Sequence, residues 1–498
     1  MTVSWEAHLP AGVRAEDVDL TAKGSLPAAW AEVWASAPSA PILHDRERGW
    51  IDAHQLEDAT RRVAGRLQAA GLEPGDRMLF SAESSLELVV AHVAALRSGI
   101  VVVPTNTAYR EREVTHVVSD SRPKAALVDD PDRAGWIRAA AGQETVVVGP
   151  EVDLPDREPA VLDAADPGDP ALLGYTSGTT GSPKGAVLTH SNLLAGSESV
   201  GLAWRWTAAD RLVLALPLFH AHGLCVGLHG TLLAGASAVL LPRFDVDAVL
   251  DAAGDQDATM FFGVPTMYHR LAQSPRVGEL ARLRLCVSGS APLPAELHGT
   301  LAERGGQQVL ERYGMTETIM NVSNPYDGER RAGSVGLPLP GVELRLAGGE
   351  DGEIQLRGPN VFGGYWERPE ANAESFEDGW FRTGDLGGLD ADGYLRILGR
   401  SKELIISGGF NVYPREVEDV LLGHPDVAEV AVVGTPSDEW GEVVTAFVVP
   451  AGERPAADSL VDFAAERLAG FKRPRVVHFV DTLPRNALGK VLKHELAP

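Results

Sequence analysis

The chain is poor in cysteine and in uninterrupted apolar segments, and both shortages exclude classes of protein. Its 498 residues include two cysteines, Cys225 and Cys286, and neither stands in a Cys-X-X-Cys pair. A disulfide framework is therefore excluded, a thiolate metal site is not expected, and a reducing cytoplasm fits the composition. The polar first twenty residues lack the apolar core of a signal peptide. The most apolar run, Leu88–Pro104, contains charged residues and a glycine, which predicts a buried helix entering a strand rather than a membrane span.

Positive charge is also scarce. The formal net charge is −25, which argues against nucleic-acid binding, so an anionic substrate must meet locally placed cations. Most basic residues are arginines, and a lysine retained in such a composition suggests a need for a compact, mobile ammonium group. The seven lysines are Lys23, Lys124, Lys184, Lys402, Lys472, Lys490 and Lys493.

Alternating strand and helix patterns occupy most of the chain, whose length suggests two to four domains. This alternation predicts parallel, doubly wound sheets. The first series is Gln55–Ala70, Arg77–Ser81, Ser85–Arg97, Val101–Pro104, Glu111–Ser119 and Lys124–Val128. The second is Arg211–Leu216, Gly223–Ala234, Ala238–Leu241, Val246–Ala253, Met260–Val264, Thr266–Gln273, Leu283–Ser288 and Pro294–Glu303.

The pattern changes after Asn324. Short β runs such as Gly352–Arg357 and Leu395–Leu398 between Gly and Asp turns predict a small barrel, and mixed α and β segments follow from Ser401. We therefore expect an α/β protein with an N-terminal domain, 1–399, of two doubly wound sheets and a barrel. A small α+β domain, 400–498, would follow it.

Tyr175–Gly185 reads Tyr-Thr-Ser-Gly-Thr-Thr-Gly-Ser-Pro-Lys-Gly and is the most informative segment. Its glycines allow backbone N–H groups to approach a ligand, its hydroxyls donate hydrogen bonds, and its lysine adds charge. This combination predicts a polyphosphate cradle, whereas a plain linker would not need Pro183-Lys184-Gly185. A Walker loop would have glycine before the lysine and Ser or Thr after it, so this segment is not one.

Three further segments carry polar groups suited to a nucleotide. Glu311–Glu317 offers the flat ring of Tyr313, the hydroxyl of Thr316 and the Glu317 carboxylate for Mg²⁺. Asp385 and Arg400 could bind a ribose, although either residue alone is more often a turn acid or a surface arginine. Lys490, within Pro484–Lys490, stands in a Pro- and Gly-framed loop, whereas lysines near a terminus are usually solvated.

These four segments, together with Gly399-Arg400, occur in the order and approximate spacing of the adenylate-forming acyl-CoA synthetases. The chain resembles that family from about Leu26 onward. The resemblance implies the two-sheet N-terminal domain with its barrel and a mobile C-terminal domain. The reactants it implies are ATP, Mg²⁺, coenzyme A and a small carboxylic acid, with no nucleic acid and no membrane span. We expect a cytoplasmic monomer or homodimer.

The resemblance also assigns roles to individual residues. It assigns the phosphates to Thr176, Ser177, Gly178, Thr179, Thr180 and Lys184, the nucleotide base and its surroundings to Gly289, Ser290, Ala291, Pro292, Glu311, Arg312 and Tyr313, the α-phosphate to Thr316, the metal to Glu317, the ribose to Asp385 and Arg400, the pantetheine channel to Gly408 and Gly409, the hinge to Lys402 and the catalytic lysine to Lys490. In this scheme Lys490 assists attack of the carboxylate on ATP. The C-terminal domain then turns about Lys402, and the CoA thiol attacks the acyl-adenylate.

Several stretches resemble malonyl-CoA synthetases in particular: Leu218–Gly223, Gly263–Arg270, Thr318–Gly328 and Phe410–Pro414. A dicarboxylate needs a cation for its second carboxylate, and arginine suits this role through its planar fork. We expect Arg270 to bind that carboxylate, His220 to assist and Met320 to border the acid. The alternative for Arg270 is an arginine on a helix surface. His220 and His222 lack a third ligand for a metal.

Other enzyme classes and a non-catalytic protein are alternatives to a malonyl-CoA synthetase. A synthetase for a fatty, aryl or bulky specialised acid is the nearest alternative, and a stand-alone module that loads a carrier protein is the next. A kinase or P-loop ATPase is disfavoured by Pro183, and release of AMP and pyrophosphate rather than ADP would exclude it. A non-catalytic nucleotide-binding protein is disfavoured because Lys490 and Glu317 are both present.

Overall fold

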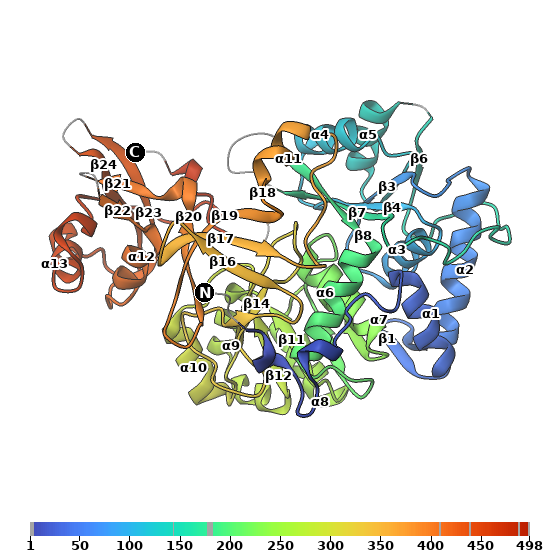
Figure 1. The fold of residues 1–498 in the computed structure, drawn as a ribbon, viewed down its shortest axis with the longest axis horizontal. Helices are drawn as coiled ribbons and strands as arrows, with labels where there is room; N and C mark the ends of the chain where they lie inside the picture. Colours follow the sequence, from blue (N-terminus) through green and yellow to red (C-terminus); the bar gives the residue numbers. More distant parts are fainter. Residues whose placement is uncertain are drawn as a thin grey trace. The chain divides into compact units, whose positions relative to one another are not determined.

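The computed structural model describes residues 4–142, 144–176, 183–407, 410–437, 440–486 and 489–496. The chain forms two compact units, one of Met1–Leu344 with Leu356–Phe381 and the other of Arg345–Gln355 with Arg382–Pro498. Figure 1 shows the elements of both units. The boundary expected at Gly399-Arg400 is not tested by this division and stays a prediction.

A six-stranded sheet in the first unit has the order β6-β5-β3-β4-β7-β8. Its strands pair in parallel except for the last two, which form an antiparallel hairpin. The strands are β3 (Arg77–Ser81), β4 (Val101–Pro104), β5 (Ala125–Val128), β6 (Val146–Val148), β7 (Pro170–Thr176) and β8 (Lys184–Thr189). The helices of this region are α1 (Leu26–Ser36), α2 (Ala53–Ala69), α3 (Leu86–Arg97), α4 (Glu111–Ser121), α5 (Pro131–Ala141) and α6 (His190–Ala203).

A nine-stranded sheet in the same unit has the order β15-β14-β13-β12-β11-β9-β10-β1-β2. Its strands are β1 (Pro41–Asp45), β2 (Gly49–Asp52), β9 (Arg211–Leu214), β10 (Ser237–Leu240), β11 (Met260–Gly263), β12 (Leu285–Ser288), β13 (Leu310–Tyr313), β14 (Val322–Ser323) and β15 (Leu337–Pro338). The helices are α7 (His229–Leu233), α8 (Val246–Asp255), α9 (Pro265–Gln273) and α10 (Ala295–Gly305). The strands from β1 through β10, β9, β11 and β12 to β13 pair in parallel.

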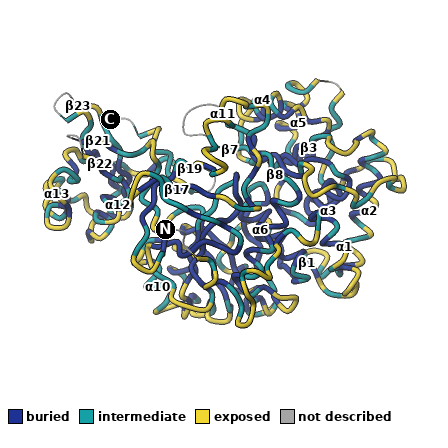
Figure 2. Tube along the Cα trace, in the orientation of Figure 1, coloured by how far each residue is buried: buried dark blue, intermediate teal, exposed yellow. Residues whose placement is uncertain are grey.

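The central strands are apolar along their whole length because both faces are covered. All four residues of β11 and of β12 are buried, as expected of parallel strands packed on two sides. Figure 2 shows these buried strands within a partly exposed outer layer. The apolar run at Leu88–Pro104 is the buried helix α3 followed by β4, which confirms that prediction.

Polar caps fix where two helices begin. Asp52 accepts a hydrogen bond from the Gln55 backbone and starts α2, and Thr189 does the same with Asn192 at the end of β8. The helix expected at Gly223–Ala234 differs, because residues His222–Leu228 form a π-helix before α7. Here Gly223 lies against the preceding chain, and a Cβ on it would stand 2.5 Å from the Pro217 carbonyl oxygen.

A curled antiparallel sheet follows, made of β16 (Glu343–Ala347), β17 (Asp351–Arg357), β18 (Phe376–Glu377), β19 (Trp380–Leu389) and β20 (Leu395–Arg400), with α11 (Pro369–Ser375) beside β18 in sequence. The last region is α+β. It contains β21 (Ile405–Ser407), β22 (Phe410–Val412), β23 (Val427–Ser437), β24 (Gly441–Pro450) and β25 (Val476–Phe479), with α12 (Pro414–Leu422) and α13 (Ala457–Ala465). The predicted fold class is confirmed, and the expected barrel is this curled sheet.

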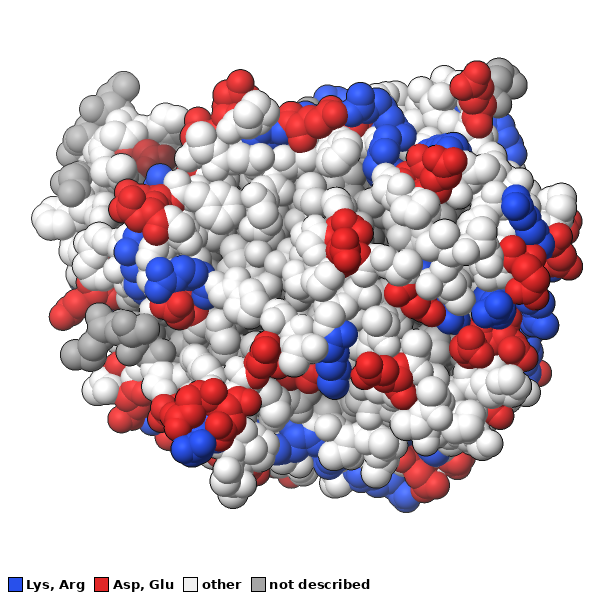
Figure 3. Space-filling view, turned by 45° about the vertical axis from the view of Figure 1, so that its right-hand side comes forward, with Lys and Arg blue, Asp and Glu red and all other residues white. Residues whose placement is uncertain are grey.

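Acidic and basic side chains alternate over the face drawn in Figure 3, where neither sign forms a continuous field. Within the described ranges, no helix combines the length and the apolar character needed to cross a membrane.

Candidate active site

The Tyr175–Gly185 segment is held at its base by a β-hairpin. Thr176 at the end of β7 pairs with Lys184 at the start of β8, and Tyr175 pairs with Gly185. Residues 177–182 lie outside the described residues, so the predicted phosphate ligands Ser177, Gly178, Thr179 and Thr180 are not placed. The structure therefore defines where the loop begins and ends.

Both arms of the hairpin are anchored to other parts of the first unit. The Tyr175 hydroxyl donates to Asp120 Oδ2 at 2.7 Å, and Arg368 forms an ion pair with the other oxygen of Asp120. Burial and then this hydrogen bond raise the pKa of Tyr175. On the other arm, the Trp366 backbone donates to the Gly185 carbonyl at 2.8 Å. The loop is thus presented from a fixed base.

Thr316 packs directly on this hairpin. A Cβ on Gly174 would lie 2.5 Å from Thr316 Cγ2, so only a glycine allows the two to approach so closely. Glu317, the next residue, has a buried side chain, and its Oε1 accepts a hydrogen bond from the Tyr365 hydroxyl at 2.9 Å. The predicted α-phosphate and metal residues therefore lie beside the predicted phosphate loop.

The carboxyl ends of parallel strands place the other predicted groups at one sheet edge. Residues 289–292 follow β12, and residues 311–313 lie on β13, which pairs with β12. Ligands of open α/β sheets bind at this edge. Ser290 has a positive φ of 68°, which is uncommon for a residue with a side chain, and its hydroxyl is buried without a hydrogen-bond partner in the described chain.

Glu311 and Tyr313 differ in what they can contact. Glu311 is buried and accepts a hydrogen bond from the Leu293 backbone at 2.9 Å, so it holds the turn at Gly289–Pro292 in place. Tyr313 is half-buried, and its hydroxyl lies 3.9 Å from the Met315 sulfur. The ring of Tyr313 and the turn are the groups available to a purine.

Arg312 is a buried cation between these two residues. Its guanidinium fills the space beside Gly289, where a Cβ would lie 2.3 Å from Nε and Cζ. In the part of the chain that the structure describes, Nε and Nη2 have no hydrogen-bond partner. Burial lowers the pKa of Arg312 to about 9, so the group stays charged at neutral pH. A buried, incompletely paired charge is costly, and an anionic ligand would offset that cost.

His220 and His222 belong to the same polar cluster. His220 is half-buried and His222 is buried, and the Arg312 guanidinium is near enough to act on both. Burial and then Arg312 lower the pKa of His220 to about 4 and hold that of His222 well below its usual value. Both imidazoles are therefore neutral at pH 7 and can donate or accept hydrogen bonds.

Arg270 and Met320 occupy different surroundings. Arg270 is exposed on α9, with its guanidinium 5.0 Å from the centre of the Phe244 ring. Met320 is buried, and its carbonyl accepts a hydrogen bond from Asn360 Nδ2 at 3.0 Å. Their roles toward the acid remain predictions.

The second unit brings Asp385 and Arg400 together. They are paired residues of β19 and β20, and Arg400 Nε lies 2.6 Å from Asp385 Oδ1. Lys402 is exposed in a short 3₁₀ turn, Ser401–Glu403, and its hinge role remains a prediction. Gly408 and Gly409 lie outside the described residues.

Lys490 stands in a closed loop of the second unit. Its backbone N–H donates to Asn486 Oδ1 at 2.9 Å, and Arg485 and Val491 pair across the loop. Although the side chain keeps an exposed surface, desolvation and then the Arg400 guanidinium lower the pKa of Lys490. The proposed catalytic lysine and the proposed ribose residues thus interact within one unit.

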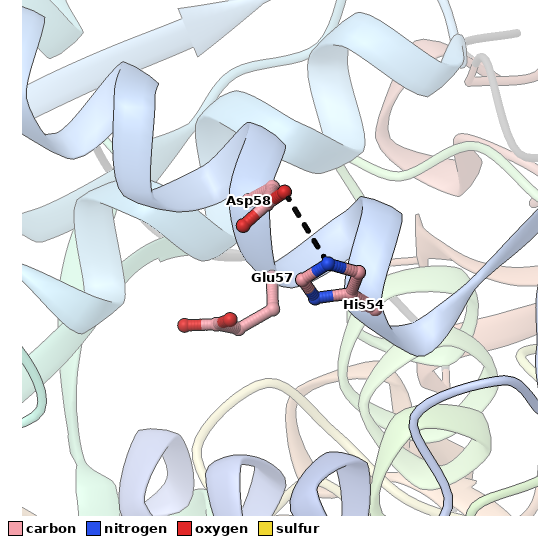
Figure 4. A group of neighbouring side chains, drawn as sticks. All are labelled: His54, Glu57 and Asp58. Carbon is pink, nitrogen blue, oxygen red and sulfur yellow. Dashed lines mark ion pairs between the residues drawn. The ribbon is translucent and has the colours of Figure 1, made fainter.

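A separate cluster on α2 has metal-ligating side chains. His54, Glu57 and Asp58 offer ligand atoms within 4.8 Å of one another. His54 pairs with Asp58 at 3.7 Å, and Figure 4 shows this pair as a dashed line. Glu57 also contacts Arg97 at 3.5 Å. The cluster is largely exposed and contains none of the predicted site residues.

Sequence reasoning missed Tyr365. It follows Gly363-Gly364 and precedes Trp366, and an aromatic pair after two glycines was the only local signal. Arg312 was predicted among the residues around the nucleotide base and stays a prediction, and nothing in the Leu310–Tyr313 sequence signals that its side chain is buried.

A hairpin at the base of a hydroxyl-rich segment, a carboxylate beside the hairpin and a turn at a sheet edge fit an adenylate-forming enzyme. The chain matches the AMP-binding enzyme family over residues 30–366 and the AMP-binding enzyme C-terminal domain over residues 416–490. It is 41% identical over 457 residues to feruloyl-CoA synthase of an Amycolatopsis species, covering 89% of this chain and 92% of that protein. It is 37% identical over 471 residues to malonate–CoA ligase of Arabidopsis thaliana, covering 85% and 78%.

Solved structures agree with this assignment. The ATP-bound structure of MatB from Rhodopseudomonas palustris has a TM-score of 0.87 and 41% identity, covering 95% of this chain and 98% of that one. The chain belongs to the AMP-binding enzymes, within the adenylate-forming acyl-CoA synthetase superfamily, and is an AMP-forming acid–thiol ligase. The predicted family and enzyme class are confirmed.

Proposed function

We propose that this ligase activates malonate, or its methyl-substituted form, and transfers the acyl group to coenzyme A. The observation that carries the proposal is the buried guanidinium of Arg312, which lowers the pKa of His220 and whose Nε and Nη2 are unpartnered in the described chain. An acid with a second carboxylate would pair with this cation, whereas a monocarboxylate would leave it buried and unpaired. We assign the distal carboxylate to Arg312 rather than to exposed Arg270.

The reaction proceeds in two steps. A carboxylate oxygen of the acid attacks the α-phosphorus of ATP, the bond to the β-phosphate oxygen breaks, and pyrophosphate leaves. The CoA thiol then attacks the acyl carbon, loses its proton, and AMP leaves. Both reactants of the first step are anions, so positioning and cationic groups supply most of the catalysis.

Residues of both units have roles in this scheme. Lys184 would bind the leaving pyrophosphate, Thr316 the α-phosphate, and Lys490 the attacking carboxylate and the α-phosphate. Asp385 and Arg400 would bind the ribose. The Glu317 carboxylate offers the oxygen donor that Mg²⁺ prefers. Bound Mg²⁺ would neutralise charge on the phosphates. Residues 408 and 409 would border coenzyme A.

A comparison of acids as substrates tests this proposal, because the relatives include both a malonate–CoA ligase and a feruloyl-CoA synthase. AMP release should be measured with ATP, Mg²⁺ and CoA across malonate, methylmalonate, acetate, butyrate, a fatty acid and ferulate. We expect the highest kcat/KM for malonate or methylmalonate. If kcat/KM were higher for ferulate or for the fatty acid, that acid rather than malonate would be the proposed substrate. AMP release without CoA dependence would indicate a module that loads a carrier protein.

Replacing Arg312 by leucine should raise KM for malonate about 10–100-fold, because a hydrogen bond to a charged group contributes roughly 1.5–3 kcal/mol. KM for butyrate should change little, and Tm should not fall because a buried charge is removed. Arg270→Leu is the matched control and should affect both acids equally. If Arg270→Leu instead raised KM for malonate and not for butyrate, Arg270 would be the residue that binds the distal carboxylate. A rise in KM for ATP in Arg312→Leu would place Arg312 at the nucleotide.

A further inference from the structure

Tyr365 lies between the two groups proposed to handle the leaving pyrophosphate. Its hydroxyl donates to Glu317 Oε1 at 2.9 Å, and Lys184 Nζ lies 5.1 Å from the centre of its ring. The ring also packs edge-on against Phe362, with centroids 4.9 Å apart. One side chain therefore contacts both the proposed metal ligand and the proposed phosphate cation.

The backbone of Tyr365 is fixed on two sides. It pairs with Ala186 of β8, and the neighbouring Trp366 backbone donates to Gly185 at 2.8 Å. On the other side, the Asn372 amide accepts from the Tyr365 N–H at 2.6 Å and donates to its carbonyl at 3.0 Å. Because these bonds fix the chain at Tyr365, the phenol has a defined position relative to the hairpin.

The position of Tyr365 separates the positive charge of Lys184 from the negative charge of Glu317. A lysine and a carboxylate this close to one aromatic ring would gain by pairing directly with each other, and such a pair would be unavailable to phosphate and metal. The ring gives the ammonium a cation–π partner, and the hydroxyl gives the carboxylate a neutral donor. A phenol thus interacts with both groups while carrying no charge of its own.

We propose that Tyr365 is a positioning residue for the first step: it keeps Lys184 and Glu317 apart and orients the Glu317 carboxylate for the divalent cation. The inference depends on the roles proposed above for Lys184 and Glu317 and does not depend on which acid is the substrate. Residues that orient metal ligands commonly change metal affinity 10–100-fold when they are replaced.

The test is a titration of the full-length enzyme with Mn²⁺ in the presence of α,β-methylene-ATP, followed by electron paramagnetic resonance. Tyr365→Phe keeps the ring and loses the hydroxyl, so it should weaken Mn²⁺ binding about 10-fold, the lower end of outer-shell effects. In kinetics, the Mg²⁺ concentration at half-maximal rate should rise while KM for the acid stays constant. Unchanged Mn²⁺ affinity in Tyr365→Phe would overturn the proposal.

Two further variants separate positioning from general loosening. Tyr109→Phe removes a half-buried phenol of the same unit that has no part in the proposed site, and it should leave Mn²⁺ affinity unchanged; an equal loss in both variants would indicate general loosening and refute the proposal. Tyr365→Leu should weaken Mn²⁺ binding further, because Lys184 can then pair with Glu317. If Tyr365→Leu bound Mn²⁺ no more weakly than Tyr365→Phe, the charge-separating role would be refuted.

Discussion

Replacing Lys490 by alanine should abolish formation of the acyl-adenylate while leaving its conversion to the thioester largely intact. The reason is that the two steps place different demands on charge. Joining two anions requires a cation between them, and loss of one preorganised donor costs roughly 10²–10³-fold in rate. Attack of the thiol on the adenylate expels AMP, a good leaving group, and does not require that cation. The closed loop around Lys490, with its bond to Asn486, presents the ammonium group from a defined backbone.

The two half-reactions can be measured separately. ATP–pyrophosphate exchange reports the first, and CoA-dependent AMP release from supplied malonyl-adenylate reports the second. Lys493→Ala is the matched control, because the Lys493 ammonium forms ion pairs with Glu418 at 2.7 Å and Glu403 at 3.6 Å. That variant should lower stability and leave both half-reactions close to wild type. An equal fall of both half-reactions in Lys490→Ala would contradict the assignment.

Acidification from pH 6.5 to pH 5 should lower the free energy of unfolding by about 3 kcal/mol through two histidines. His92 and His229 are buried, their rings stack with centroids 5.1 Å apart, and their Nε2 atoms are 2.8 Å apart. One Nε2 must donate and the other accept, so the accepting ring is neutral, and the burial of both rings disfavours a charge on the donor. Burial lowers the pKa of His92 to about 3, and burial, then His92 and His190, hold that of His229 well below its usual value.

The direction in which the free energy of unfolding changes with pH follows from proton binding. Below the unfolded pKa of about 6.5 the unfolded chain takes up two protons that the folded chain does not, so stability is lost as pH falls. Each histidine contributes about 1.4 kcal/mol per pH unit. Denaturant unfolding at pH 7, 6 and 5 should show this slope. The double variant His92→Phe with His229→Leu should remove the share of these two histidines, while His220 and His222, whose pKa values are also lowered by burial, keep theirs. His54→Gln, on exposed α2, is the control and should keep the full slope. An unchanged slope in the double variant would assign the acid sensitivity elsewhere.

The fold was predictable because it depends on repeated local patterns. Apolar strands such as Met260–Gly263 alternate with amphipathic helices, and each pattern predicts its element without reference to the rest of the chain. The segment at Thr176 and Lys184 and the residue Glu317 could be selected from the sequence because their side chains are unusual in type and order, and their roles stay predictions. The π-helix at His222–Leu228 was not predicted, because the close approach of Gly223 to the Pro217 backbone depends on tertiary structure that no local pattern shows.

Parts of the site depend on contacts that no local pattern encodes. Arg270 and Arg312 are both arginines near the end of an element, and only burial distinguishes the exposed one from the one enclosed beside His220. Tyr365 reaches Glu317 from 48 positions further along the chain. A residue whose role is to separate two others has no chemical signature of its own in the sequence.

The contact between Gly174 and Thr316 has a consequence for how this enzyme can diversify. Any side chain at 174 would displace the threonine methyl group, which would lie only 2.5 Å from the new Cβ. The two positions are thus bound to change together, if at all, although one belongs to a strand of the six-stranded sheet and the other follows the nine-stranded sheet. Single substitutions of pocket residues can change which acid is preferred. A change at the contact between Gly174 and Thr316 would instead need two substitutions together.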